Sequence, residues 1–376
     1  MNTKRTTRRI ILGLGVLAAA LVLLPLEARQ PADKTPPAGR SDGAETLSEV
    51  EVIRRVNAAT DRALDYLEKI QIKEGVDAGA WVPSNNAINA MAVLAFLSRG
   101  HVPGRGKYGD TVEGGVTKPG VLTLARKFIL SQQSKVAATE GYFGPQMYHH
   151  GMCTLALAEM YGMDPDPELE EGLRKAVDCI LRSQGPKGGW NYAPSPVDGD
   201  LSVSVMAIVA MRAASNAEIP VPEIAIKKAI AYVKGMANPS GGGFGYGGPG
   251  AGPQTSAAGT LSLQLLGAYD DPQIPKTLDY LAAGVKPTWK VGGASYFYYF
   301  HYYAMQAFYQ HGGKQWNEWH GPVREMLLAN KNDDGSWDVP DGAEIGLISK
   351  DNKAYSTALA TLVLNIYQHY LPAYQR

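Results

Sequence analysis

A two-helix unit recurs about six times after residue 50, and this repeat constrains the fold more than any single residue does. Each unit has a charged amphipathic helix, a turn of glycine followed by an aromatic residue, and a helix of small and apolar residues. From Phe143 to Trp190 is 47 residues, and from Trp190 to Phe244 is 54. A period of this size indicates one supersecondary unit stacked on copies of itself.

The turns are Gly79-Ala80-Trp81, Gly141-Tyr142-Phe143, Gly188-Gly189-Trp190, Gly242-Gly243-Phe244 and Gly335-Ser336-Trp337. Phe244 and Trp337 are 93 residues apart, which leaves room for a fifth unit whose turn has degenerated. The first helix of a unit, as in 221–236, mixes charges into an apolar stripe, whereas the second, as in 205–211, is apolar nearly all round. Because apolar helices need protein on most sides, we expect two concentric rings. The predicted fold is all-α, an α/α toroid (barrel) of about six helical hairpins.

The N-terminal segment has the pattern of an export signal. Four basic residues precede an uncharged apolar run at 10–26, so we interpret 1–28 as a signal peptide. The run of 17 residues is at the short limit for crossing a bilayer, so an uncleaved membrane anchor is the alternative. Residues 29–45 are rich in proline and glycine and read as a flexible linker before the toroid at 46–376. The sequence therefore predicts an exported, periplasmic or otherwise extracytoplasmic protein.

Charge and composition exclude several partners. The 36 basic and 36 acidic residues cancel, and the folded part has no Lys/Arg cluster, so we do not expect nucleic-acid binding. The seven histidines show no metal-ligand spacing, and we expect neither metal nor cofactor. Cys153 and Cys179 are compatible with one disulfide in an exported protein, or with two buried thiols in apolar helices.

Aligning the second helices without gaps places six polar residues in one column. They are Asn89, His150, Ser204, Ser256, His301 and Thr357. If these helices all run the same way, their N-termini converge at one mouth of the ring. The column then has two interpretations: its side chains satisfy backbone N–H groups near the helix starts, or they face a ligand. The sequence leaves both open.

Two further features favour a site at this mouth. Asp200 comes directly before the third inner helix, and the aromatic run 296–303 leads into the fifth. Aromatic rings line apolar pockets and stabilise cationic groups, although this run is also suited to fill the space of the missing turn. The candidate catalytic residues are Asp200, His150 and His301. The candidate ligand-binding residues are Asn89, Ser204, Ser256, Tyr299, Tyr302 and Thr357.

The turns also carry a family resemblance. The stretches 188–192, 242–246 and 334–338 (GGWNY, GGFGY and DGSWD) resemble repeats of the prenyltransferase and squalene-oxidase-repeat superfamily. This superfamily includes squalene-hopene cyclases, protein prenyltransferase β subunits and thioester domains, and the likeness is closest to exported bacterial members whose activity is not settled. The resemblance covers about residues 50–372 and implies a toroid of six hairpins.

The catalytic motifs of these enzymes are absent from the sequence. A class II cyclase needs Asp-x-Asp-Asp to protonate an alkene, and a thioester domain needs Cys-Gly-Glu-Gln; neither occurs here. A prenyltransferase holds zinc with Asp, Cys and His, but Asp178-Cys179 falls on an outer helix. We therefore expect the cavity to bind an apolar, isoprenoid-like ligand or a peptide or protein partner. The alternative is a diverged cyclase or transferase acting on isoprenoid or polycyclic lipid.

Overall fold

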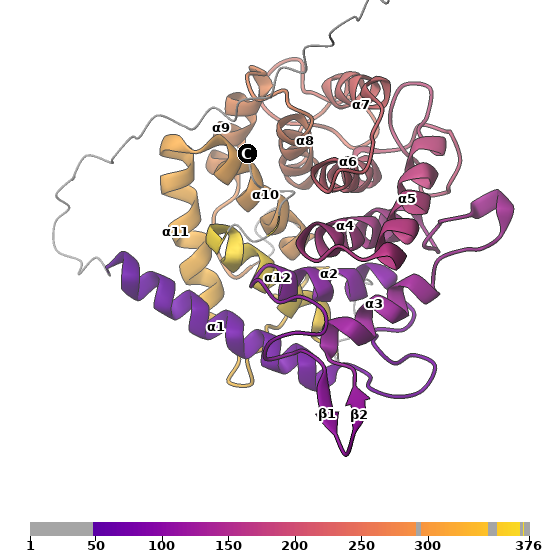
Figure 1. Ribbon diagram of the computed structural model, residues 1–376. Helices are drawn as coiled ribbons and strands as arrows, with labels where there is room; N and C mark the ends of the chain where they lie inside the picture. The colour runs from indigo at the N-terminus through magenta and orange to yellow at the C-terminus, as the bar shows by residue number, and fades with distance from the viewer. Residues whose placement is uncertain (1–47, 291–294, 345–351, 369–370, 372–376) are drawn as a thin grey trace, which may run out of the picture. The chain divides into compact units, whose positions relative to one another are not determined.

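The computed structural model describes residues 48–290, 295–344, 352–368 and 371 (Figure 1). The predicted signal peptide and linker lie outside these residues. The described chain alternates six outer with six inner helices. The outer helices are α1 (Glu49–Ile70), α3 (Val121–Ser131), α5 (Pro167–Arg182), α7 (Glu223–Gly235), α9 (Gln273–Gly284) and α11 (Gly313–Ala329). The inner helices are α2 (Asn86–Leu97), α4 (Met147–Met163), α6 (Leu201–Asn216), α8 (Pro253–Leu265), α10 (Phe297–His311) and α12 (Ala354–Leu364).

The inner helices form a closed ring. Each one packs against the next, and α12 returns to pack against α2. The outer helices lie around them, with α1 packed against α12 (Figure 1). Arg55 of α1 forms an ion pair with Glu325 of α11 at 2.9 Å, which joins the first and last outer helices. The prediction of an all-α toroid of two concentric rings is confirmed.

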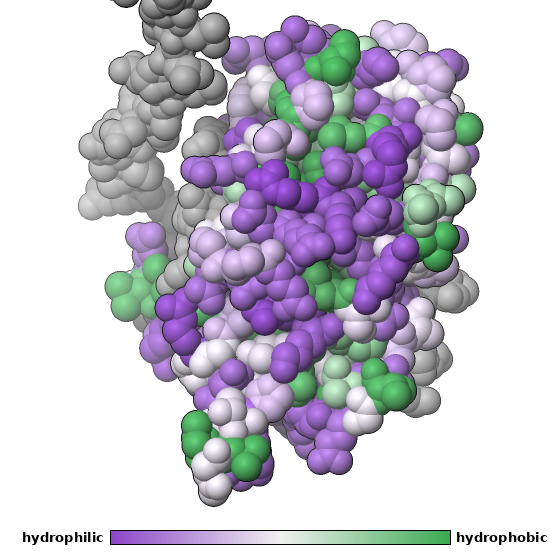
Figure 2. All heavy atoms as spheres, turned by 45° about the vertical axis from the view of Figure 1, so that its right-hand side comes forward, coloured by the Kyte–Doolittle hydropathy of each residue, from purple (hydrophilic) through white to green (hydrophobic). Residues whose placement is uncertain are grey.

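The two kinds of helix follow from their residue patterns. In α5 the Asp166 side chain caps the N-terminus by accepting from the backbone N–H of Glu168 and Leu169. Leucine, alanine and isoleucine at helical spacing bury the inner face of α5, and its charges face solvent. In α12, by contrast, every residue is buried. The face of the molecule in Figure 2 is correspondingly largely hydrophilic.

Short elements outside the rings complete the described chain. A two-stranded antiparallel hairpin, β1 (Thr111–Glu113) with β2 (Val116–Lys118), precedes α3 and was not expected from the sequence. Two 3-10 helices, η1 (Ala137–Thr139) and η2 (Asn365–Gln368), lie before α4 and after α12. Cys153 and Cys179 are both buried free thiols, so the disulfide alternative is wrong.

The glycine–aromatic turns fix each unit against the next outer helix. Gly188 has φ +104°, and a Cβ atom added there would lie 2.1 Å from the carbonyl oxygen of Lys228 in α7. Gly335 makes the same approach to Arg62 of α1, where an added Cβ would lie 2.4 Å from the carbonyl oxygen. Only glycine combines this backbone conformation with so close a contact. The last turn therefore closes the ring onto its first helix.

Side chains around the turns repeat as well. The indole N–H of Trp190 donates to the carbonyl of Ile180 at 2.8 Å, and Trp81 and Trp337 bond their own outer helices in the same way. The Gln184 amide donates to the carbonyls of Gly188 and Ala225, which links the turn to α7. The indole bonds thus give a second donor to carbonyls in the last turns of α1, α5 and α11, and the glutamine ties the turn to the start of α7.

Candidate functional site

Five members of the polar column make one and the same contact. Each is buried and is the fourth residue of its inner helix. Each accepts a hydrogen bond from the backbone N–H of its turn's aromatic residue. The pairs are Asn89 with Trp81 (2.8 Å), His150 with Phe143 (3.1 Å), Ser204 with Trp190 (3.0 Å), Ser256 with Phe244 (2.9 Å) and Thr357 with Trp337 (3.2 Å). These contacts explain why a polar residue occupies this position in five of the inner helices. A ligand-binding role for these residues stays a prediction.

His150 has both ring nitrogens engaged. Its Nδ1 accepts from Phe143, and its Nε2 lies 3.0 Å from the carbonyl oxygen of Ala176 and donates to it. Burial is the main cause that lowers its pKa to about 4, so the ring is neutral near pH 7. A buried neutral imidazole bonded on both sides has no nitrogen left for a substrate.

His301 belongs to the unit without a turn, and its contacts differ. It is the fifth residue of α10, and its Nδ1–H donates to the carbonyl of Phe297 at 2.8 Å. The ring packs against Phe297 and is stacked on Trp319. Its Nε2 is buried and has no hydrogen-bond partner among the described residues. Burial lowers its pKa to about 4 as well.

A cavity of about 890 Å³ opens where the inner helices begin. All six inner helices contribute a residue from their first turn or N-cap, as the predicted convergence of N-termini requires. Six tyrosines line it: Tyr148, Tyr192, Tyr246, Tyr296, Tyr299 and Tyr355. Amide and hydroxyl groups lie between them, on Asn85, Gln146, Ser202, Gln254, Thr255 and Ser295. Among the described lining residues there is no Lys, Arg, Asp or Glu, and Tyr299 is the one candidate site residue.

The repeat itself positions the tyrosines at the rim. Tyr192 and Tyr246 each stand two residues after a turn aromatic. Their carbonyls accept from the first N–H of the preceding inner helix, Met147 at 2.8 Å and Leu201 at 2.9 Å. Their hydroxyls are 2.8 Å apart. The sequence signal for them was the shared Trp-x-Tyr and Phe-x-Tyr pattern of the third and fourth units.

The deeper tyrosines are neutral hydrogen-bonding groups. Tyr299 and Tyr355 are 9% and 6% exposed. Burial is the main cause that raises the pKa of both hydroxyls above the usual value, so they stay protonated. The hydroxyl of Tyr299 is buried and has no hydrogen-bond partner within the described chain. Since an unpaired buried hydroxyl costs free energy, it is suited to a ligand or a water molecule.

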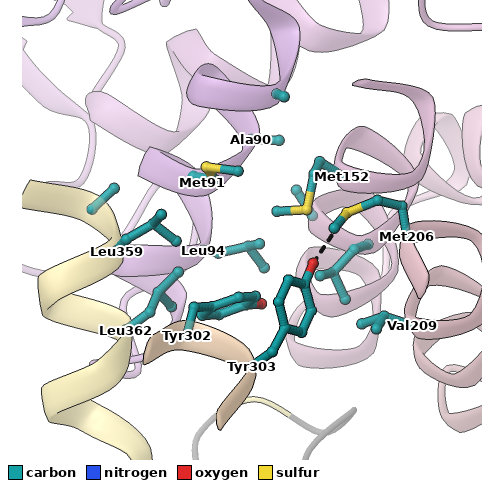
Figure 3. Close-up of a cluster of buried hydrophobic side chains, with 14 of the residues drawn as sticks. Ala90, Met91, Leu94, Met152, Met206, Val209, Tyr302, Tyr303, Leu359 and Leu362 are labelled. Atoms are coloured by element: carbon teal, nitrogen blue, oxygen red, sulfur yellow. Dashed lines mark hydrogen bonds between the residues drawn. The ribbon is translucent and has the colours of Figure 1, made fainter. Parts of the chain in front are cut away.

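Apolar side chains fill the ring next to this cavity. Figure 3 shows methionine, leucine and tyrosine side chains from α2, α4, α6, α10 and α12 pointing toward one another. Met91 belongs both to this cluster and to the cavity lining, so the two adjoin. The Tyr303 hydroxyl donates to the sulfur of Met206 at 3.3 Å across the ring. Tyr302, which the sequence analysis expected to bind the ligand, lies in this cluster and not in the cavity lining.

Asp200 is an N-cap beside the cavity. Its Oδ1 accepts from the backbone N–H groups of Ser202 at 2.9 Å and Val203 at 3.1 Å, and from the Ser202 hydroxyl at 2.5 Å. It is 6% exposed and does not line the cavity, whereas Ser202 does. The capping contacts explain why the residue before α6 is an aspartate.

Glu344 is a buried carboxylate that the sequence analysis missed. Its Oε1 accepts from the backbone N–H of Tyr298 at 2.6 Å, and its own N–H donates to the carbonyl of Ser295. The Tyr298 hydroxyl donates to the carbonyl of Asp338. The stretch 338–344 thus covers the start of α10, where the fifth turn is missing. Burial raises the Glu344 pKa to about 7, although the N–H groups of α10 and the Tyr355 hydroxyl favour the charged form.

Comparison with solved structures agrees with this architecture. Neither a scan of protein-family models nor a search of curated proteins gave a match. Type II terpene cyclase MstE from Scytonema, in complex with geranylgeranyl dihydroxybenzoate, is 13% identical over 84% of this chain and 98% of its own, with a TM-score of 0.54. Cellobiose 2-epimerase from Spirochaeta thermophila is 11% identical over 85% and 98%, with a TM-score of 0.59.

A third similar structure is an inactive variant of the α-1,6-mannanase GH76A of Salegentibacter sp. HEL1_6 with α-1,6-mannotriose. It is 10% identical over 82% of this chain and 98% of its own, with a TM-score of 0.54. At such identities the likeness shows the fold alone, and the class that it defines is the α/α toroid. In the described part of the chain, no helix is long and apolar enough to span a membrane, and no group of three or more His, Cys, Asp or Glu is arranged to hold a metal.

Proposed function

We propose that this protein binds a small organic molecule without anionic groups in the tyrosine-lined cavity. The observation that carries the proposal is the lining itself, in which six tyrosines lie among amides and hydroxyls and the described residues include no Lys or Arg. Tyrosine rings supply broad apolar contact and a polar edge. Phosphate or carboxylate ligands are held by Arg, Lys or helix N-termini carrying free N–H groups. Here the carboxylates of Asp200 and Glu344 already accept from first-turn N–H groups of α6 and α10.

The size of the cavity fits such a ligand. Pockets for small molecules commonly measure about 300–1,000 Å³, and this one is about 890 Å³. Met91, Met206 and Tyr303 pack in the ring beside it, so within the described residues this cluster closes the side of the cavity toward which a long isoprenoid chain would extend. The geometry therefore supports a compact ligand held at the mouth of the ring.

Binding is testable with two neutral probes and one anionic probe, which shares its hydrocarbon chain with one of the neutral probes. Calorimetric titrations of the full chain would compare α-1,6-mannotriose and geranylgeraniol with geranylgeranyl diphosphate. We expect mannotriose, the compact neutral probe, to bind, and Tyr246→Ala to weaken that binding about tenfold through loss of ring contact. Tyr269→Ala, at an exposed tyrosine outside the cavity lining, is the matched control. Tighter binding of the diphosphate than of the alcohol would contradict the proposal.

Glu344 favours catalysis as a second candidate function. A buried carboxyl with a pKa of about 7 matches what a general acid or base needs at neutral pH. Glu344 does not line the cavity itself, but its carboxyl group interacts with the hydroxyl of Tyr355, which does. If a bound probe is converted, Glu344→Gln is expected to abolish turnover and leave binding within about threefold of wild type. Unchanged turnover in this variant would exclude Glu344 as the acid.

We also propose that the toroid functions outside the cytoplasm. The support is the basic and apolar pattern of residues 1–28 in the sequence. Fractionation of the host followed by N-terminal sequencing tests it. A mature chain beginning near residue 29 outside the cytoplasm is expected after cleavage, and an intact chain in the membrane fraction would indicate the anchor instead. Intact protein in the cytoplasm would overturn the proposal.

A further inference from the structure

We propose that the ligand of the cavity is an organic cation, a quaternary or tertiary ammonium held against the tyrosine faces. This rests on the proposed binding function and names its ligand class. Three observations carry it: the six-tyrosine lining, the lack of Lys and Arg among the described lining residues, and two buried acidic residues, Asp200 and Glu344, that are hydrogen-bonded to the lining residues Ser202 and Ser295. Aromatic faces attract cations through the ring quadrupole, and clusters of such faces recognise quaternary ammonium groups.

Asp200 supplies one of the carboxylates. It caps α6 beside the cavity-lining Ser202. Burial is the main cause that raises the pKa of Tyr246 and Tyr299, and the charge of Asp200 adds to the increase in both. The Ser202 hydroxyl, which belongs to the cavity lining, lies 2.5 Å from the Asp200 carboxylate, so this charge is next to the cavity. Its negative charge therefore reaches the cavity through tyrosines at the rim and in the deeper wall.

Glu344 supplies the other carboxylate on a different part of the wall. Its charge adds to the effect of burial in raising the pKa of Tyr148 from α4 and Tyr355 from α12. Lys353, at the start of α12, forms an ion pair with Asp338 at 2.8 Å. Among the described residues, the titratable groups that interact with Glu344 are Tyr148, Tyr298 and Tyr355, all uncharged near pH 7.

Unpaired polar atoms in the lining fit the remainder of such a ligand. The Tyr299 hydroxyl is buried in the cavity wall without a hydrogen-bond partner in the described chain, and so is Nδ1 of His149. Burial lowers the pKa of His149, so its ring is neutral and does not repel a cation. A hydroxyl or ether oxygen linked to the ammonium group has a donor and an acceptor available here.

The proton equilibrium of Glu344 gives the inference a second signature. A cation in the cavity favours the ionised carboxylate and lowers its pKa. At a pH well below both the free and the ligand-bound pKa, Glu344 is protonated with or without ligand and adds nothing to binding. As the pH rises through about 7, the charged carboxylate becomes available and binding strengthens. Binding near pH 7 therefore releases protons.

The test compares choline with 3,3-dimethylbutan-1-ol, an uncharged molecule of the same shape. Both are titrated against the full chain by calorimetry at pH 6 and pH 8. We expect choline to bind at least tenfold more tightly than the alcohol, with the preference larger at pH 8. Glu344→Gln is expected to reduce the preference and remove its pH dependence. Asp200→Asn keeps a good N-cap while removing the charge, and is also expected to reduce the preference.

The outcomes separate this inference from the proposed function. Equal affinities for choline and the alcohol, or binding of mannotriose or geranylgeraniol without binding of choline, would overturn the cation and leave the cavity as a neutral-ligand site. Failure of every probe would overturn both. Far-ultraviolet circular dichroism and thermal melting of each variant establish folding, and a choline preference that persists in both folded variants would also contradict the inference.

Discussion

The hydroxyl oxygen of Ser204 accepts a hydrogen bond from the backbone N–H of Trp190 at 3.0 Å, and its own hydrogen is donated to the carbonyl of Asp200. Both hydrogen bonds are buried, and in the same unit the indole N–H of Trp190 donates to the carbonyl of Ile180. One side chain thus joins the turn to the start of α6. Four other units repeat the acceptor, and three of them use another residue type, namely Asn89, His150 and Thr357. The acceptor is therefore needed, and not the serine as such.

Ser204→Ala is expected to destabilise the protein by about 1–3 kcal/mol, since it leaves the buried Trp190 N–H without an acceptor. Urea unfolding followed by tryptophan fluorescence measures this change. Ser215→Ala, at an exposed serine of the same helix, is the control and is expected to stay within about 0.5 kcal/mol of wild type. A cost as small as the control's would show that the turn does not depend on this bond.

Gly188→Ala is expected to be among the most destabilising single changes at a turn. The residue has φ +104°, and the added Cβ would lie 2.1 Å from a backbone oxygen of α7. Backbone strain of this kind costs about 1–3 kcal/mol before any repacking. Gly235→Ala, at the end of α7 with nothing within 4 Å, is the matched control. Thermal melting should show a clear decrease for the first variant and little change for the second; equal melting temperatures would contradict the packing argument.

Buried histidines predict how stability depends on pH. The pKa of His301 is lowered to about 4, below the value of the unfolded chain, so the unfolded state binds more protons between pH 4 and about 6.5. This stability is fully present above pH 6.5 and is lost as the pH falls through that window. The contribution of one such group is on the order of 3 kcal/mol. Glu344, with its raised pKa, acts in the opposite sense, so a difference between variants is needed.

His301→Phe isolates the histidine contribution. The ring already packs among Phe297, Phe300 and Trp319, so an aromatic replacement fits the site without a titratable group. Urea unfolding at pH 5 and pH 7.5 should show a smaller loss of stability at low pH in the variant than in wild type. An identical loss in both proteins would mean that His301 does not titrate on unfolding.

The architecture was predictable because it is encoded locally, whereas the cavity was not. The turn, the amphipathic stripe and the polar residue that binds the turn, such as Ser204, all occur within one unit, so their spacing is visible in the sequence. The cavity tyrosines come from separate units, and only the shared positions of Tyr192 and Tyr246 gave a signal. Glu344 meets Tyr298 across 46 residues through a loop without a pattern. Tyr299 and Tyr302 lie on one helix, yet one lines the cavity and the other packs in the apolar cluster.

The apolar cluster beside the cavity leads to the last prediction. Met206 is 1% exposed and accepts the hydroxyl of Tyr303 across the ring. Met206→Ala is expected to cost about 2–5 kcal/mol through lost packing and a new cavity. Because the cluster adjoins the site at Met91, the same change should deepen the pocket and admit longer apolar ligands.

Two measurements check this prediction, with Met236→Ala at a partly buried methionine after α7 as the control. Urea unfolding should show the larger cost at Met206. Titration with 1-butanol and 1-dodecanol should show tighter binding of the longer alcohol in Met206→Ala alone. If wild type and Met206→Ala prefer dodecanol over butanol to the same extent, the cluster does not limit the depth of the site. An isoprenoid-sized ligand then becomes the better interpretation of the cavity.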